Sequence, residues 1–307
     1  MCPGREGPPM DQAGQLLQGV FMIIFLWSMN AGVGMSYTVK EVLAPFERWK
    51  TITLAVVLNC LVVPLMYFGL TKVLPMGSDY AIGFLLVGFA SAAPATLKYV
   101  GFAKGDVPLT VGLVVLLGAL NVVVIPLWSA LLMPAGTTIN GVQVALTLGV
   151  LVLVPLLAGL FIRARWSDRA HEWAPGAAKV SNLALVLLIV VTLFTSWESV
   201  ASVFGAWVIV GALAAMLVQM IAGYLIGTDK PSRRALSLLT GVRATGPALA
   251  IATAAFGTNE KVMATVIVIA VVSFIPVIVS LEWGREAKGA ASAPSASSAG
   301  GAKKRRG

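Results

Sequence analysis

Charged residues are scarce in this sequence of 307 residues: Asp, Glu, Lys and Arg make up 11% of it, against roughly 25% in an average soluble domain. Hydrophobic residues make up 58%, and the mean hydropathy is +0.90. So few charges cannot cover a water-soluble globule of this size. The composition therefore excludes an ordinary soluble enzyme, a nucleic-acid-binding domain and a disordered protein, although the net charge is +9.

Cysteine and histidine are almost absent. Cys2 and Cys60 lie far apart in sequence, which makes a disulfide framework improbable. The one histidine, His171, falls in a predicted charged loop, so neither a His/Cys metal site nor a catalytic triad is expected. The polar N-terminus has no short apolar core of a signal peptide. We therefore expect no enzyme, no cofactor and no metal of these kinds.

Long apolar runs fill most of the chain instead. A transmembrane helix needs about 20 apolar residues, and the sequence predicts nine such segments, at 17–37, 51–74, 80–104, 107–133, 140–163, 180–197, 204–227, 232–256 and 261–283. Residues 1–16 form a polar N-terminal segment. Residues 284–307 are predicted to be a disordered basic tail, rich in Ala, Ser and Gly. The predicted fold is all-α and polytopic, in a lipid bilayer.

Basic residues fall in alternate loops. Seventeen lie on one predicted side, in loops around Lys40, Lys104, Arg163 and Lys230 and in the tail, whereas Arg5, Lys72 and Lys261 lie on the other. Because cytoplasmic loops are enriched in Lys and Arg, we expect the N-terminus outside and the C-terminus in the cytoplasm, in a plasma (bacterial inner) membrane.

Two cations, Lys98 and Arg243, fall inside predicted spans, while no Asp or Glu falls at the middle of a span. An ionisable group within a membrane is costly and therefore marks a candidate functional site. Lys98 has the alternative of reaching the membrane surface if its span ends early. Arg243 is nearer to the centre of its span.

The spans at 80–104 and 232–256 are both interrupted. Pro94 interrupts the first, and Pro247 interrupts the second together with Gly241 and Gly246. The charge pattern gives the two spans opposite orientations. Broken helices at corresponding positions are typical of transporters built from inverted repeats, in which the substrate site lies where the breaks meet. Packing by small residues is the alternative explanation for each break alone.

These residues resemble the bacterial branch of the bile acid:sodium symporter family, over about residues 19–283. The resemblance is carried by residues 31–35, Asn59 with Pro64, residues 94–97 with 103–109, and residues 240–243 with 246–250. It implies a panel domain and a core domain, with two crossing broken helices in the core. It also implies a secondary transporter that moves a small or amphipathic organic anion by alternating access.

The usual sodium ligands of that family are largely replaced. Where sodium-coupled members have a Ser-Asn pair this chain has Thr96-Leu97, and where they have Glu and then Gln-Asn it has Leu239 and then Arg243-Ala244. Val114 replaces a threonine, Asn59 a glutamine, and Thr110 fits a serine. Sodium coupling is therefore possible but doubtful.

The expected partners are a small organic anion and the bilayer, with no nucleic acid and no obligate protein. The substrate-binding candidates are Arg243, Lys98, Thr96, Asn59, Thr245 and Asn30. Two alternatives stay open. One is a membrane sensor or scaffold of the same fold that does not transport. The other is an arsenite-type efflux carrier, for which Cys60 is the one intramembrane thiol.

Overall fold

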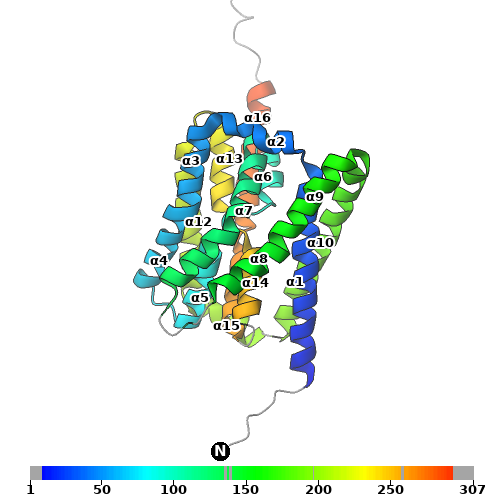
Figure 1. The fold of residues 1–307 in the computed structure, drawn as a ribbon. Helices are drawn as coiled ribbons and strands as arrows, with labels where there is room; N and C mark the ends of the chain where they lie inside the picture. The colour runs from blue at the N-terminus through cyan, green and yellow to red at the C-terminus, as the bar shows by residue number, and fades with distance from the viewer. Residues whose placement is uncertain (1–8, 135–136, 138–139, 196, 257–258, 293–307) are drawn as a thin grey trace, which may run out of the picture.

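The computed structural model describes residues 9–134, 137, 140–195, 197–256 and 259–292, and in these ranges every regular element is a helix (Figure 1). The helices of the first half are α1 (Pro9–Ser36), α2 (Val39–Leu43), η1 (Ala44–Arg48), α3 (Trp49–Val57), η2 (Leu58–Val62), α4 (Val63–Val73), α5 (Ser78–Phe89), α6 (Thr96–Phe102) and α7 (Val107–Leu132). Those of the second half are α8 (Gly141–Leu148), η3 (Gly149–Leu153), α9 (Val154–Arg165), α10 (Ser167–Thr195), α11 (Trp197–Gly205), α12 (Val208–Ile226), α13 (Lys230–Gly241), α14 (Thr245–Phe256), α15 (Glu260–Val272) and α16 (Ile275–Ser292).

Eight helical stretches in the described residues are long and apolar enough to cross a membrane. They are 16–36, 39–73, 107–132, 141–165, 167–194, 208–226, 230–256 and 260–287. The broken pair α5–α6 accounts for the remaining predicted segment, because α5 alone has only 12 residues. The prediction of an all-α polytopic membrane protein is confirmed.

Three long segments form one layer, which we call the panel: α1, the α8–α9 segment and α10. In Figure 1, α1, α9 and α10 stand together on the right. Close packing between α1 and α9 depends on Gly34 and Gly159. A Cβ added to either glycine would come within about 3 Å of the Cα atom of the other. A Cβ at Gly34 would overlap the carbonyl oxygen of Leu156, so the two helices approach at small residues, as membrane helices commonly do.

The remaining segments form a second layer, which we call the core. The pairs α5–α6 and α13–α14 lie within it, and their half-helices run in opposite directions, since α6 and α13 lie at the upper end of Figure 1 and α5 and α14 at the lower end. The α13–α14 segment is the most enclosed of the eight candidate spans, with 94% of its apolar window buried. This helix therefore lies inside protein rather than against lipid.

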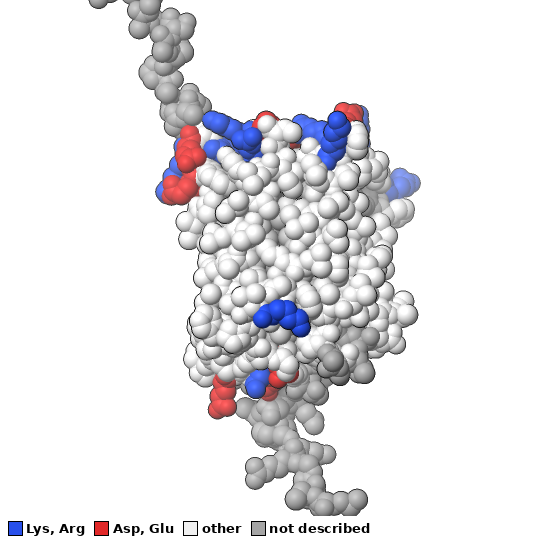
Figure 2. Space-filling view, turned by 90° about the vertical axis from the view of Figure 1, so that its left-hand side faces the viewer, with Lys and Arg blue, Asp and Glu red and all other residues white. Residues whose placement is uncertain are grey.

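Lys and Arg gather at one end of the molecule, the upper end in Figure 2, where α2, α6 and α13 lie in Figure 1. Arg48 there pairs with Asp106 at 2.6 Å, and Arg234 pairs with Glu286 at 3.3 Å. The wide band between the two ends is almost free of charge on the face shown (Figure 2). We call the upper end the basic end.

The structure differs from the sequence-based expectation at three places. α1 begins at Pro9, inside the segment predicted as polar and non-membrane, and α16 continues to Ser292, past the predicted start of the tail at Gly284. His171 lies in α10 and not in a loop. The physical reason is the same in each case: a charged residue marks where the membrane ends, whereas a helix can continue into water. The rest of the predicted tail, residues 293–307, lies outside the described residues.

Candidate functional site

The first break separates α5 from α6 and is held open by α7. Ala92 adopts a left-handed conformation with φ of 40°, and Pro94 follows two residues later. Asn121 of α7 then binds the unwound chain: its Oδ1 accepts from the Ser91 amide at 2.9 Å and from the Ser91 hydroxyl at 2.7 Å, and its Nδ2 donates to the Ser91 carbonyl at 3.0 Å. An amide side chain thus replaces the hydrogen bonds that the break removes from the helix.

The second break separates α13 from α14 at Val242, Arg243 and Ala244. Gly241 is the last residue of α13, and Gly246 lies in the first turn of α14. Pro247 is the third residue of α14, where a helix needs no backbone donor, so the proline starts the second half-helix and does not distort it.

The two breaks cross in contact with each other. The Ala93 amide donates to the Val242 carbonyl at 3.3 Å, which joins the two unwound segments directly. Residues about 150 positions apart in sequence therefore share one backbone hydrogen bond at the middle of the core. The predicted meeting of the two interrupted helices is present in the structure.

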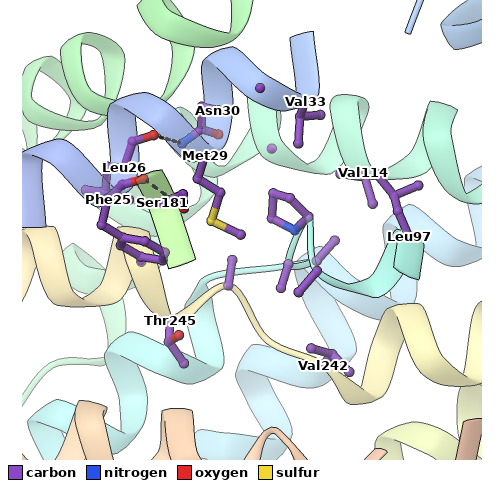
Figure 3. A pocket seen from close by; sticks show the side chains of 18 of the residues that line it. Phe25, Leu26, Met29, Asn30, Val33, Leu97, Val114, Ser181, Val242 and Thr245 are labelled. Atoms are coloured by element: carbon purple, nitrogen blue, oxygen red, sulfur yellow. Dashed lines mark hydrogen bonds between the residues drawn. The ribbon is translucent and has the colours of Figure 1, made fainter. Parts of the chain in front are cut away.

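A cavity of about 420 Å³ lies on the panel side of this crossing. Figure 3 shows Phe25, Met29 and Val33 of α1 facing Val242 and Thr245 across it. The α1 residues that line it run from Phe25 to Ser36, and the α10 residues from Ala174 to Ile189. Since α1 ends and α10 begins at the basic end, the cavity extends from mid-depth toward that end.

The cavity wall is largely apolar and carries a small polar set. Two cations, Lys98 and Arg243, are among its lining residues. Lys98 is exposed and makes no side-chain hydrogen bond or ion pair with the described part of the chain. Thr245 also lines the cavity, as does Asn30, whose Nδ2 donates to the Leu26 carbonyl at 2.8 Å (Figure 3). This leaves the side-chain oxygen of Asn30, Oδ1, available to accept a hydrogen bond from a ligand.

The charged head of Arg243 lies away from the cavity. Its Nη1 donates to Asn59 Oδ1 at 3.1 Å and its Nη2 to the Gly88 carbonyl at 2.7 Å, and neither partner lines the cavity. Gly88 is in the last turn of α5, so the guanidinium faces the negative end of a half-helix dipole. The Asn59 Nδ2 in turn donates to Thr240 Oγ1 at 3.3 Å. We call Arg243, Asn59, Thr240 and the Gly88 carbonyl the rear cluster.

The rear cluster is deeply buried. Arg243 is 2% exposed and Asn59 is fully buried, and Arg243 forms no ion pair with any described carboxylate. Its Nε has no partner in the part of the chain that the structure describes. A buried charge must be compensated by neighbouring dipoles or anions, and here the backbone carbonyl and the amide oxygen provide part of that compensation.

The other predicted positions divide between the cavity and the core. Leu97, Val114 and Ala244 line the cavity, as does Pro94. Thr96, Thr110 and Leu239 are buried and lie outside the cavity wall. The Thr110 hydroxyl donates to the Asp106 carbonyl at 2.8 Å, whereas the Thr96 hydroxyl is buried and finds no partner within the described ranges.

Two contributors were not chosen from the sequence. In the sequence, Asn121, which holds the first break, is one of several uncharged polar residues inside the predicted spans. Ser181 of α10 lines the cavity opposite the crossing. A small polar residue inside an otherwise apolar helix was the available signal, but it does not say which face the residue occupies.

The protein has two layers of membrane helices and a cavity at the crossing of two broken helices. This architecture is that of a membrane transporter. The family model described as "Sodium Bile acid symporter family" matches residues 23–203. This is more than half of the chain, so the protein belongs to that family, which is one of transporters and not of enzymes.

The relatives carry the same class name. The chain is 22% identical over 240 residues to the "Uncharacterized sodium-dependent transporter YocS" of Bacillus subtilis, covering 77% of this chain and 74% of that protein. It is 25% identical over 266 residues to the "Probable sodium/metabolite cotransporter BASS3, chloroplastic" of Oryza sativa and 23% identical over 239 residues to BASS1 of Arabidopsis thaliana. These alignments cover 84% and 76% of this chain, but only 62% and 59% of the plant proteins.

Proposed function

We propose that this protein is a secondary transporter that moves a small or amphipathic organic anion by alternating access. The observation that carries the proposal is Lys98. It is an exposed cation that has no partner among the described residues, on the wall of a cavity that lies at the crossing of two broken helices. An anionic group of the substrate supplies the partner that Lys98 lacks.

The cavity favours a substrate with an apolar body. Its volume of about 420 Å³ falls within the usual range for small-molecule sites, about 300–1,000 Å³. Phe25, Met29 and Val33 form its apolar side (Figure 3). Asn30 and Thr245 offer hydrogen bonds to a hydroxyl or carboxyl group.

The basic end is proposed to face the cytoplasm, in a plasma (bacterial inner) membrane. The support is the excess of Lys and Arg that cytoplasmic loops carry, and the proposed orientation has the N-terminus outside. In that orientation the cavity extends toward the cytoplasm, which supports the proposal of an inward-facing state.

Arg243 is proposed to act as a fixed positive charge in place of a bound sodium ion. Its guanidinium binds the Gly88 carbonyl and the Asn59 amide oxygen, the kinds of oxygen that would otherwise bind a hard cation. A second cation about 4 Å away would be repelled by roughly 4 kcal/mol at an effective dielectric of 20. We therefore expect uptake without a sodium requirement, although the relatives' names refer to sodium.

The arsenite carrier and the sensor or scaffold, the two alternative functions, can each be compared with the structure. Cys60, which an arsenite carrier would use, is absent from the cavity wall, and its carbonyl is bound by Trp128. A sensor or scaffold would bind the anion in the same cavity without moving it. Counterflow of radiolabelled organic anions in proteoliposomes separates these functions. Exchange that saturates and needs Lys98 supports the transporter, whereas binding without exchange supports the sensor.

A further inference from the structure

One membrane helix of the core contains a π-turn at the level of the rear cluster. Residues Leu58–Val62 between α3 and α4 form η2, in which the Val63 amide donates to the Leu58 carbonyl five residues earlier. Asn59, which binds Arg243, is the second residue of this turn. Single π-turns inside α-helices are often found at functional sites.

Proline and tryptophan together explain why the turn persists. In an α-helix the amide of residue 64 would donate to the carbonyl of residue 60, but Pro64 has no N–H. The Cys60 carbonyl is instead taken by the indole Nε1 of Trp128, at 2.7 Å. Trp128 lies on α7, a different helix, so the lost bond is replaced from outside.

The turn decides which residues face the rear cluster. It adds one residue to a helical turn, and one residue corresponds to a rotation of about 100°. Asn59 at the start of the turn and Tyr67 after it are both buried in the core. The ring centroids of Tyr67 and Phe84 are 4.6 Å apart. If the segment relaxed to a regular α-helix, one of these two side chains would rotate away from the core.

We propose that Trp128 is a positioning residue for the rear cluster: its indole N–H holds the π-turn that points Asn59 at Arg243. The same helix holds the first break through Asn121, two helical turns earlier on α7. α7 therefore fixes both the broken helix α5–α6 and the turn that binds the second break. This inference concerns the folded protein and does not depend on which substrate is moved.

Hydrogen exchange of the purified protein tests the proposal. Trp128→Phe removes the donor together with part of the ring, whereas 3-benzothienylalanine at position 128 keeps the bicyclic ring and replaces the N–H by sulfur. Both should raise exchange about tenfold at residues 58–62, and also at residues 240–246 on the other side of the rear cluster. Trp27→Phe, on the exposed side of α1, is the matched control and should change neither region.

The second region separates positioning from local support. If the two donor-free variants raise exchange at 58–62 only, Trp128 supports its own surroundings and the proposal fails. It also fails if neither region changes. Asn59→Ala provides a further check, because adding Trp128→Phe to it should raise exchange at 240–246 no further. An additional tenfold increase would show that Trp128 acts independently of Asn59. Because no step requires uptake, a failure here is distinct from a failure of the transport function.

Discussion

Replacing Arg243 by alanine is the sharpest perturbation that the structure suggests. The substitution removes a cation that is 2% exposed and leaves two buried acceptors, the Gly88 carbonyl and Asn59 Oδ1, without their donor. A buried acceptor without a partner costs about 1–3 kcal/mol. Removing the guanidinium also removes the cost of burying its charge, so the net loss of stability should be about 2–4 kcal/mol.

The vacated space should then accept a free cation. It is lined by a helix-terminal carbonyl and an amide oxygen, so methylguanidinium or Na⁺ at about 10 mM should raise the melting temperature of Arg243→Ala. The wild type should show no such response, because its own guanidinium occupies the place. Thermal unfolding in detergent, with choline as the reference cation, measures both effects.

Arg285→Ala is the matched control. Arg285 also pairs, with Glu282 at 2.7 Å, but its side chain is 76% exposed, and an exposed pair contributes about 0–1 kcal/mol. The reasoning is refuted if Arg243→Ala is as stable as the control, or if every cation leaves its melting temperature unchanged.

Three further predictions concern separate parts of the molecule. Gly34→Ala should destabilise the panel by roughly 1–3 kcal/mol or more in thermal unfolding, because the new Cβ meets the backbone of α9; a melting temperature equal to the wild type would contradict the close packing. Lys98→Gln should raise KM for an anionic substrate about tenfold with little change in melting temperature, whereas Lys72→Gln, far from the cavity, should not change KM. Hydrogen bonds from Ser232 hold the pKa of the Asp229 carboxyl below its ordinary value of 3.8. This contribution to stability is present above that pH and is lost as the pH falls through the lowered pKa. Ser232→Ala should therefore be less stable than the wild type at about pH 5, and this difference in the free energy of unfolding should shrink as the pH falls to about 3. A difference that does not depend on pH would show that the bond does not act through the carboxyl.

The sequence predicted the layout of the membrane segments because two simple costs control it. Apolar runs must be long enough to cross, and Lys and Arg collect at one end. The interrupted spans were equally visible, since Pro94 and Pro247 remove backbone donors wherever they occur. The opposite orientations of the two interrupted spans predicted that their breaks would meet, but not that they would do so through Ala93 and Val242.

The direction of Arg243 could not be predicted. The sequence shows that a cation lies inside a span, but not whether its head reaches the cavity or the interior behind it. That choice depends on the Gly88 carbonyl, which is free only because α5 ends there, and on Asn59, which faces inward only because of the π-turn. Both are consequences of tertiary structure.

The roles of Asn121 and Trp128 were hidden for a related reason. Each bonds backbone atoms that a proline or a break has freed in another helix, at Ser91 and Cys60. The sequence shows which helices lack bonds, but not which side chain from another helix replaces them.

Uptake of a labelled organic anion into proteoliposomes, compared in Na⁺, K⁺ and choline media, tests the central claim most directly. The claim is that Arg243 provides a permanent cation at the crossing, so the initial rate should be the same in all three media. A saturable dependence on Na⁺, with no uptake in choline, would contradict it.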